Sequence, residues 1–178
     1  ICTRNAAREV RQAASAQERQ LLWKCRKQAF GAVGRLSPSY CTQDGVVPRT
    51  MLPHILARIT EIGARHGVRI VNVFHAGDGN ILPILLFDER DPAQVRRVLE
   101  ASHEILDECI ASGGSVTGEH GIGVEKIEFM RKLFTPDDLD VMRRLRDAFN
   151  PTGRLSPSKL LPTAGACGLA QRHPGRRA

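Results

Sequence analysis

The stretch that most constrains the fold is residues 73–88, which read VFHAGDGNILPILLFD. Two apolar runs flank an Asp-Gly pair, and this pattern is typical of two antiparallel strands joined by a tight turn. With Asp78 and Gly79 at the centre of the turn, His75 is expected to face Leu82. Side chains that face each other lie on the same side of a sheet, with Cβ atoms about 4.5–5.5 Å apart. The segment therefore predicts an antiparallel hairpin.

Helical patterns flank this hairpin. Residues 5–30 are rich in Ala, Gln and Arg and predict a first helix. The apolar residues from Leu52 onward recur with helical spacing as far as Gly67, which suits the position after a helix end. Downstream of the hairpin, Asp91 and Pro92 are typical of the N-cap and first position of another helix.

The C-terminal part returns to a helical pattern after a Gly-rich stretch. A short helix is expected over 124–133, and Thr135 is a suitable N-cap for a last helix. The apolar stripe of that helix is expected to comprise Leu139, Met142, Leu145 and Phe149. The sequence thus predicts an α+β fold: an antiparallel β-sheet with helices packed on one face, as in a ferredoxin-like cap domain, plus a C-terminal helical segment.

Composition narrows the class of protein. The 178 residues suffice for one domain, which we expect over 1–162, followed by a disordered basic tail over 163–178. Five cysteines without a CxxC pair argue against a disulfide framework and fit a reducing compartment. No apolar run is long enough to span a bilayer, and no signal peptide is visible, so we expect a cytoplasmic protein without a transmembrane segment. The net charge of +7 permits contact with nucleic acid without showing it.

Three further signals carry chemistry, and each also has a purely structural explanation. With Leu82 opposite, His75 is either half of a site or an ordinary histidine at a strand end. Glu119 and His120 adjoin each other in the glycine-rich stretch GGSVTGEHGIGVEK, where they either approach a ligand or face solvent. Arg26 lies three residues after Trp23 on a predicted helix, and it either binds a carboxylate or covers the surface.

Taken together, the motifs resemble a known family. The blocks QDGVVPRT, NVFHAGDGN, GGSVTGEHGIGVEK and FNPTGRLSPSKLLP occur here in the order and spacing of the C-terminal half of FAD-linked oxidases of the vanillyl-alcohol-oxidase type. The flavin subunit of glycolate oxidase and the D-lactate dehydrogenases are members of that family. The resemblance implies oxidation of a small 2-hydroxy acid, with hydride transfer from the α-carbon to FAD.

The resemblance also implies roles for individual residues. His120 would be the general base that takes the hydroxyl proton, and Arg26 would pair with the substrate carboxylate. Asn80 and Lys159 would lie near the flavin. His75 and Glu119 would bind a divalent metal such as zinc.

The sequence departs from the family pattern in three respects. Leu82 stands where the family usually has a second histidine, which is expected to weaken metal binding. The sequence SPSK, ending at Lys159, replaces the Asn-Pro-Gly-Lys that is often found there. We also expect the N-terminal FAD-binding domain to be absent from this chain.

Two other functions compete with the catalytic one. In the first, the chain is a non-catalytic fragment, or a partner module that complements a separate FAD-binding domain or an iron–sulfur subunit. The second is an RNA-binding module. An RNA-binding module is disfavoured, because the strands lack the aromatic pattern that sheets use for base stacking.

Overall fold

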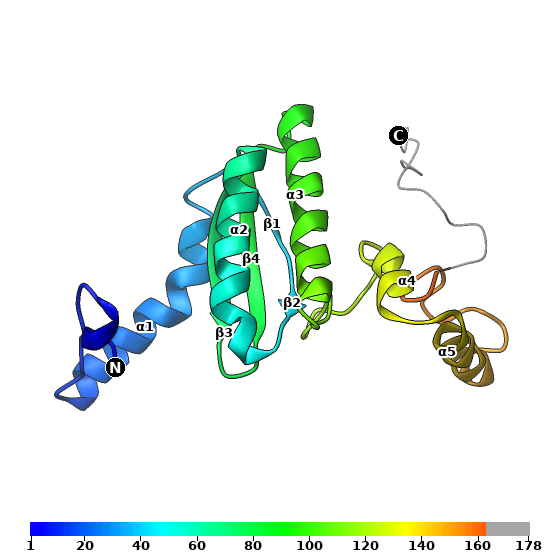
Figure 1. Ribbon diagram of the computed structural model, residues 1–178, viewed down its shortest axis with the longest axis horizontal. Helices are drawn as coiled ribbons and strands as arrows, with labels where there is room; N and C mark the ends of the chain where they lie inside the picture. The colour runs from blue at the N-terminus through cyan, green and yellow to red at the C-terminus, as the bar shows by residue number, and fades with distance from the viewer. Residues whose placement is uncertain (163–178) are drawn as a thin grey trace.

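A four-stranded antiparallel sheet forms the centre of the molecule. The computed structural model describes residues 1–162, so the predicted disorder of 163–178 lies outside the described residues (Figure 1). Strand β4 (Asn80–Phe87) is central. Strand β3 (Arg69–His75) pairs with one side of β4, while β1 (Ser39–Thr42) and β2 (Gly45–Val46) follow one another along its other side.

The central position of β4 follows from its sequence. Residues 80–86 are all buried, as expected for a nearly continuous apolar run covered on both faces. Ile81 and Leu85 belong to the larger core on one face of the sheet. Ile84 and Leu86 form a smaller cluster on the opposite face, together with Val33.

Two helices cover the first face of the sheet and confirm the predicted α+β fold. They are α2 (Leu52–His66) and α3 (Pro92–Ala111), and their buried residues form one core with β4. Both ends that the sequence predicted are present: Gly67 closes α2 in a left-handed conformation, and the Asp91 side chain accepts hydrogen bonds from the first turn of α3. None of the helices within residues 1–162 is long and apolar enough to cross a membrane.

Helix α1 (Ala16–Val33) begins later than predicted. Ser15 caps it by accepting a hydrogen bond from the Glu18 N–H, and only a 3₁₀ turn, η1 (Thr3–Asn5), precedes it. Among the residues of α1, only Val33 is buried. The helix therefore reaches the sheet with its C-terminal end and extends away from it (Figure 1).

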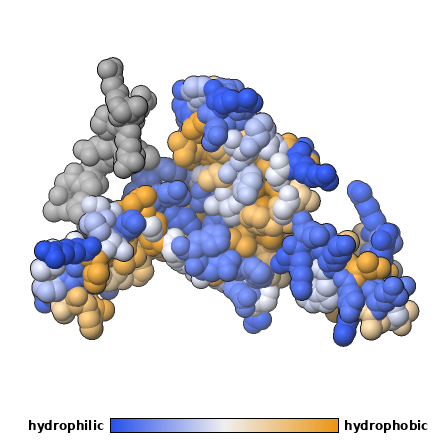
Figure 2. Space-filling view, turned by 180° about the vertical axis from the view of Figure 1, so that it is seen from behind, coloured by the Kyte–Doolittle hydropathy of each residue, from blue (hydrophilic) through white to orange (hydrophobic). Residues whose placement is uncertain are grey.

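The C-terminal segment packs beside the lower end of α3. It contains η3 (Ile127–Phe129), α4 (Met130–Leu133) and α5 (Pro136–Phe149), and a second core joins it to Leu106 of α3. Thr135 and Asp138 form the predicted capping box. The predicted stripe of α5 is wrong in its second half. Leu139 is buried, but Leu145 and Phe149 are exposed, in a region where hydrophobic side chains gather on the surface (Figure 2).

The register of the hairpin differs from the prediction. His75 pairs with Asn80, and Leu82 pairs with Val73, so the loop comprises the four residues 76–79. A hydrogen bond from the Asp78 N–H to the His75 carbonyl closes the turn, so the centre of the loop lies between residues 77 and 78 and not between 78 and 79. Because the side-chain period of a strand is two, this shift of the pairing by two keeps His75 and Leu82 on the same face, as diagonal neighbours.

A proline explains why β1 and β2 are separate strands. Pro83 lies in the middle of β4, and its carbonyl accepts a hydrogen bond from the Gln43 N–H. The N and C=O of one strand residue point to the same side, so the N–H that Pro83 lacks is missing toward Gln43. The ladder is interrupted there, and the next residue, Asp44, is free to make other contacts. A 3₁₀ turn, η2 (Arg49–Met51), then leads into α2.

Two glycines of the hairpin loop allow a test of this geometry. Gly79 has φ +74°, and a Cβ there would lie 2.1 Å from the Val47 carbonyl oxygen, whereas a Cβ on Gly77 would meet nothing within 4 Å. Gly79→Ala is therefore expected to lower the free energy of unfolding by about 2–5 kcal/mol. Gly77→Ala is the matched control and is expected to change it by less than about 0.5 kcal/mol. Urea unfolding measures both, and equal effects would contradict the loop conformation.

Candidate functional site

A cluster of polar side chains forms at the hairpin end of the sheet, around the carboxylate of Glu119. Its Oε1 lies 4.0 Å from Nε2 of His75 and 3.8 Å from Nε2 of His120. Nδ2 of Asn80 lies 3.5 Å from the same oxygen. The structure thus brings together four of the predicted site residues, two from the paired ends of β3 and β4 and two from the loop after α3.

The loop that carries Glu119 and His120 is fastened to Asp44. One carboxylate oxygen of Asp44, Oδ2, accepts hydrogen bonds from the N–H groups of Glu119 (3.1 Å) and His120 (2.8 Å) and from the Thr117 hydroxyl (2.8 Å). The Gly118 N–H is shared between both oxygens at 3.0 Å. Asp44 is fully buried, so these contacts replace all of its hydration.

Electrostatics at Asp44 favour the charged form. Burial of the carboxylate raises its pKa, but the hydrogen bonds from His120, Thr117, Glu119 and Gly118 together outweigh that effect, and the pKa lies below its ordinary value. The carboxylate is thus held as an anion by donors from a single loop.

Lys126 fixes the other end of the same loop. Its buried Nζ donates to the carbonyls of Asp44 (2.8 Å) and Val116 (2.7 Å). Burial lowers the pKa of Lys126, while the nearby Asp44 carboxylate opposes that shift. Sequence reasoning identified neither Asp44 nor Lys126 as a site residue, although both lie in the motifs QDGVVPRT and GGSVTGEHGIGVEK. The position of Asp44 just after the residue facing a strand proline was the available signal.

Close packing at Gly118 brings the loop against the sheet. A Cβ there would lie 2.7 Å from both Oδ1 of Asn80 and Cγ2 of Val46. Asn80 is itself buried, and its Oδ1 has no hydrogen-bond partner among the described residues. The Asn80 amide thus packs its oxygen against Gly118 and turns its nitrogen toward Glu119.

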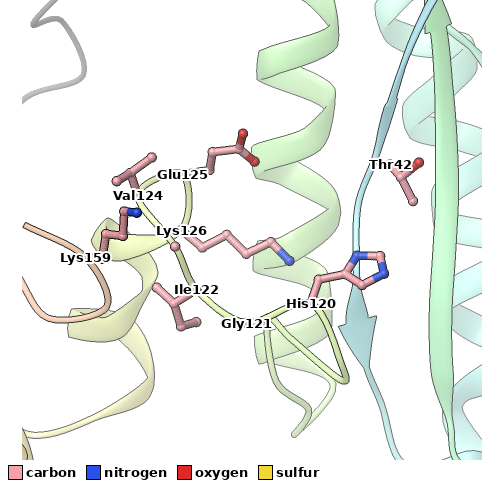
Figure 3. A pocket seen from close by; sticks show the side chains of 9 residues that line it. Thr42, His120, Gly121, Ile122, Val124, Glu125, Lys126 and Lys159 are labelled. Carbon is pink, nitrogen blue, oxygen red and sulfur yellow. The ribbon is translucent and has the colours of Figure 1, made fainter. Parts of the chain in front are cut away.

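A pocket of about 300 Å³ opens beside the cluster. His120 lies on one side of it, and Lys159 approaches from the C-terminal segment on the other (Figure 3). The side chain of Lys159 makes no hydrogen bond or ion pair with the described residues. The lining residues are Thr42, His120, Gly121, Ile122, Gly123, Val124, Glu125, Lys126 and Lys159. His120 therefore connects the Glu119 cluster to a space that suits a small molecule.

Arg26 is the predicted site residue that the structure does not bring to the cluster. It lies on the exposed helix α1, and its side chain makes no hydrogen bond or ion pair within residues 1–162. Trp23, three residues earlier, is likewise exposed. The shared helix face that the spacing predicted is present, but it faces outward.

The residues present do not complete a metal site. His75 and Glu119 are close enough to share an ion, but no group of three or more His, Cys, Asp or Glu side chains among residues 1–162 could hold a metal. Leu82 lies on the same face of the sheet, is 5% exposed and offers no ligand. The zinc suggested by the resemblance therefore has no complete set of ligands here.

Comparison with known proteins identifies the class. The family described as "FAD linked oxidases, C-terminal domain" matches residues 1–160. The chain therefore belongs to this family, which confirms the resemblance seen in its motifs.

Individual relatives carry more specific names. Glycolate oxidase subunit GlcD of Escherichia coli is 43% identical over 167 residues, which cover 94% of this chain and 34% of that protein. GlcD of Bacillus subtilis is 34% identical over 90% of this chain and 34% of its own length. The mitochondrial D-lactate dehydrogenase [cytochrome] of Arabidopsis thaliana is 29% identical over 79% of this chain and 25% of its own length. The chain thus spans about a third or less of these relatives.

The Asp44 contacts predict how stability depends on pH. Because the folded pKa is depressed, the stabilisation is fully present above the ordinary carboxyl pKa of 3.8 and is lost as the pH falls through the lower folded value. At pH 7, Asp44→Asn is expected to lower the free energy of unfolding by about 3 kcal/mol. The difference should remain constant down to about pH 5 and shrink below pH 4 in urea unfolding series.

The exposed Asp147, whose nearest cationic neighbour is Arg146 at 3.6 Å, supplies the control for this series. Asp147→Asn is expected to change the free energy of unfolding by less than about 0.5 kcal/mol. A constant Asp44→Asn difference from pH 7 to pH 2 would contradict the charged, hydrogen-bonded state of Asp44.

Proposed function

We propose that the chain is the substrate-binding C-terminal part of an FAD-dependent 2-hydroxy-acid oxidoreductase of the glycolate or D-lactate type. The observation that carries this proposal is the cluster in which His75 and His120 both lie within 4.0 Å of the Glu119 carboxylate, beside a pocket that His120 lines. Family membership and the names of the relatives supply the substrate class. The remaining two-thirds of such an enzyme would hold most of the cofactor.

His120 is the proposed general base. An imidazole can accept a proton at neutral pH, and this one reaches the pocket while its backbone N–H is held by Asp44. The imidazole of His120 would take the proton from the substrate hydroxyl and become positively charged. The Glu119 carboxylate, 3.8 Å away, would stabilise that positive charge. His75 extends the same arrangement on the far side of Glu119.

The flavin and the substrate carboxylate require other groups. Asn80, beside Glu119, and the free ammonium of Lys159, in the pocket lining, are the proposed contacts to a flavin, and this chain would contribute those contacts rather than hold the whole cofactor. When bound, FAD supplies the acceptor for the hydride that leaves the α-carbon. Arg26 is the proposed partner of the substrate carboxylate, and its exposure fits a role at a surface completed by another domain.

The share of the relatives that the chain matches also supports a second proposed function. Since the chain corresponds to about a third of its relatives, it also fits a partner module that complements a separate FAD-binding domain or works beside an iron–sulfur subunit. A non-catalytic fragment would keep the fold and lack turnover. One experiment separates these readings from the catalytic one.

A chimeric enzyme tests the proposal. Residues 1–160 replace the matching region of the E. coli GlcD relative, and reduction of an artificial electron acceptor is followed with glycolate and with D-lactate. We expect turnover with at least one of the two acids. His120→Asn is expected to lower kcat by about 10²–10⁴-fold, because it removes the base.

His54→Asn is the matched control, since His54 is an exposed histidine on α2 outside the cluster. It should leave kcat within about twofold of the parent chimera. A flavin-loaded chimera that oxidises neither acid would favour the non-catalytic module. Full activity of His120→Asn would remove His120 from its proposed role.

Metal binding gives a separate test of the same cluster. Leu82→His adds a donor on the sheet face that carries His75, so its affinity for zinc is expected to rise at least about tenfold over the parent chain. Isothermal titration calorimetry measures the change. Leu86→His is the control, because it places a histidine on the same face but farther from Glu119. An equal gain in both variants, or none in Leu82→His, would show that His75 and Glu119 are not preformed metal ligands.

A further inference from the structure

We infer that Asp44 is a positioning residue for the proposed site: its buried carboxylate holds the backbone of residues 117–120 so that Glu119 and His120 face the hairpin end and the pocket. This inference rests on the proposed function for the meaning of the site. The contacts of Asp44 themselves are independent of it.

The Asp44 carboxylate is hydrogen-bonded to this loop. Every hydrogen bond that its two oxygens make within residues 1–162 comes from 117–120, at 2.8–3.1 Å. None of these hydrogen bonds comes from α2 or α3. Lys126 meanwhile binds the Asp44 carbonyl at 2.8 Å, so the residue is held from both its backbone and its side chain.

The side chains of Glu119 and His120 have few contacts of their own that fix their direction. They are 49% and 53% exposed, and the nearest polar partners of Glu119 in the cluster lie at 3.5–4.0 Å, which is long for a hydrogen bond. Their direction therefore depends on the backbone beneath them. That backbone depends on Asp44, because the adjoining glycines 118 and 121 impose little stiffness of their own.

Four donors converge on Asp44, and a carboxylate offers four acceptor sites and no donor. In an amide of the same size, an NH₂ group in place of Oδ1 would face the Gly118 N–H, and one oxygen with two lone pairs would face all four donors. The site therefore requires the charge of Asp44 as well as its shape.

Amide dynamics in the 178-residue chain test the inference. In the unaltered chain, the ¹⁵N order parameters of Glu119 and His120 are expected near 0.85, and in Asp44→Asn they should fall below about 0.6. Hydrogen exchange of the same amides should accelerate at least about tenfold more than that of Ile59 and Leu85, which report global unfolding. Asp91→Asn, at the N-cap of α3, is the control and should leave these amides unchanged.

A second pair of variants keeps the test decisive if Asp44→Asn fails to fold. The Thr117 hydroxyl donates to Asp44 and accepts from the Gly121 N–H, both at 2.8 Å. Thr117→Val removes both bonds at nearly constant volume, and it should loosen Glu119 and His120 in the same direction as Asp44→Asn. Thr117→Ser keeps the hydroxyl and should restore the parent order parameters.

The outcomes are distinct. A uniform rise in exchange across the loop, Ile59 and Leu85 would overturn the inference, because Asp44 would then only stabilise the fold. Equal behaviour of Thr117→Val and Thr117→Ser would also overturn it. Neither measurement needs turnover. An inactive chimera with an ordered, Asp44-dependent loop would therefore refute the proposed function while supporting the positioning role.

Discussion

The buried carboxylate of Asp44 connects the two halves of the site. On one side lie the sheet and its hairpin, which carry His75 and Asn80. On the other lies the loop after α3, which carries Glu119 and His120. Without an anion between them, four loop donors would face a fully buried position with no acceptor. The geometry at Glu119 is therefore a consequence of a residue that takes no direct part in the proposed chemistry.

The arrangement around Glu119 suits the proposed proton transfer better than it suits metal binding. Two imidazoles lie within 4.0 Å of one carboxylate oxygen, and the proposed proton transfer requires no further ligand there. A metal requires a further ligand in a defined geometry, and Leu82 occupies the position on the same face that would provide one. Leu82 is a buried apolar residue of the central strand, so a leucine in place of the histidine of the family pattern fits the packing of the sheet.

The sequence predicted the fold class, the hairpin, both covering helices and the caps at Gly67, Asp91 and Thr135, because local patterns determine these features. It missed the four-residue loop of the hairpin, since Asp-Gly favours a two-residue turn and only the hydrogen bond of Asp78 to His75 decides otherwise. It also extended the stripe of α5 to Leu145 and Phe149, because periodicity identifies an apolar face without saying where the partner surface ends.

Among the candidate site residues too, local motifs predicted some, while others depend on contacts with distant parts of the chain. The resemblance predicted site roles for five residues that the structure places around one cluster and its pocket: His75, Asn80, Glu119, His120 and Lys159. Asp44 and Lys126 escaped notice because their importance lies in contacts with distant residues. Arg26 was recognised from the same resemblance, yet its helix extends away from the cluster (Figure 1). The role of Arg26 depends on what lies against α1, and the spacing of residues within one helix does not predict that.

The distance along the chain between Asp44 and its partners has a consequence for folding. These hydrogen bonds join residues that are 73–76 positions apart, with α2, the hairpin and α3 all lying between them. The entropy of closing so long a loop is recovered only after the intervening elements have packed. The cluster around Glu119 is therefore expected to form late in folding, and a nascent chain carries His75 of the hairpin before it carries Glu119 and His120.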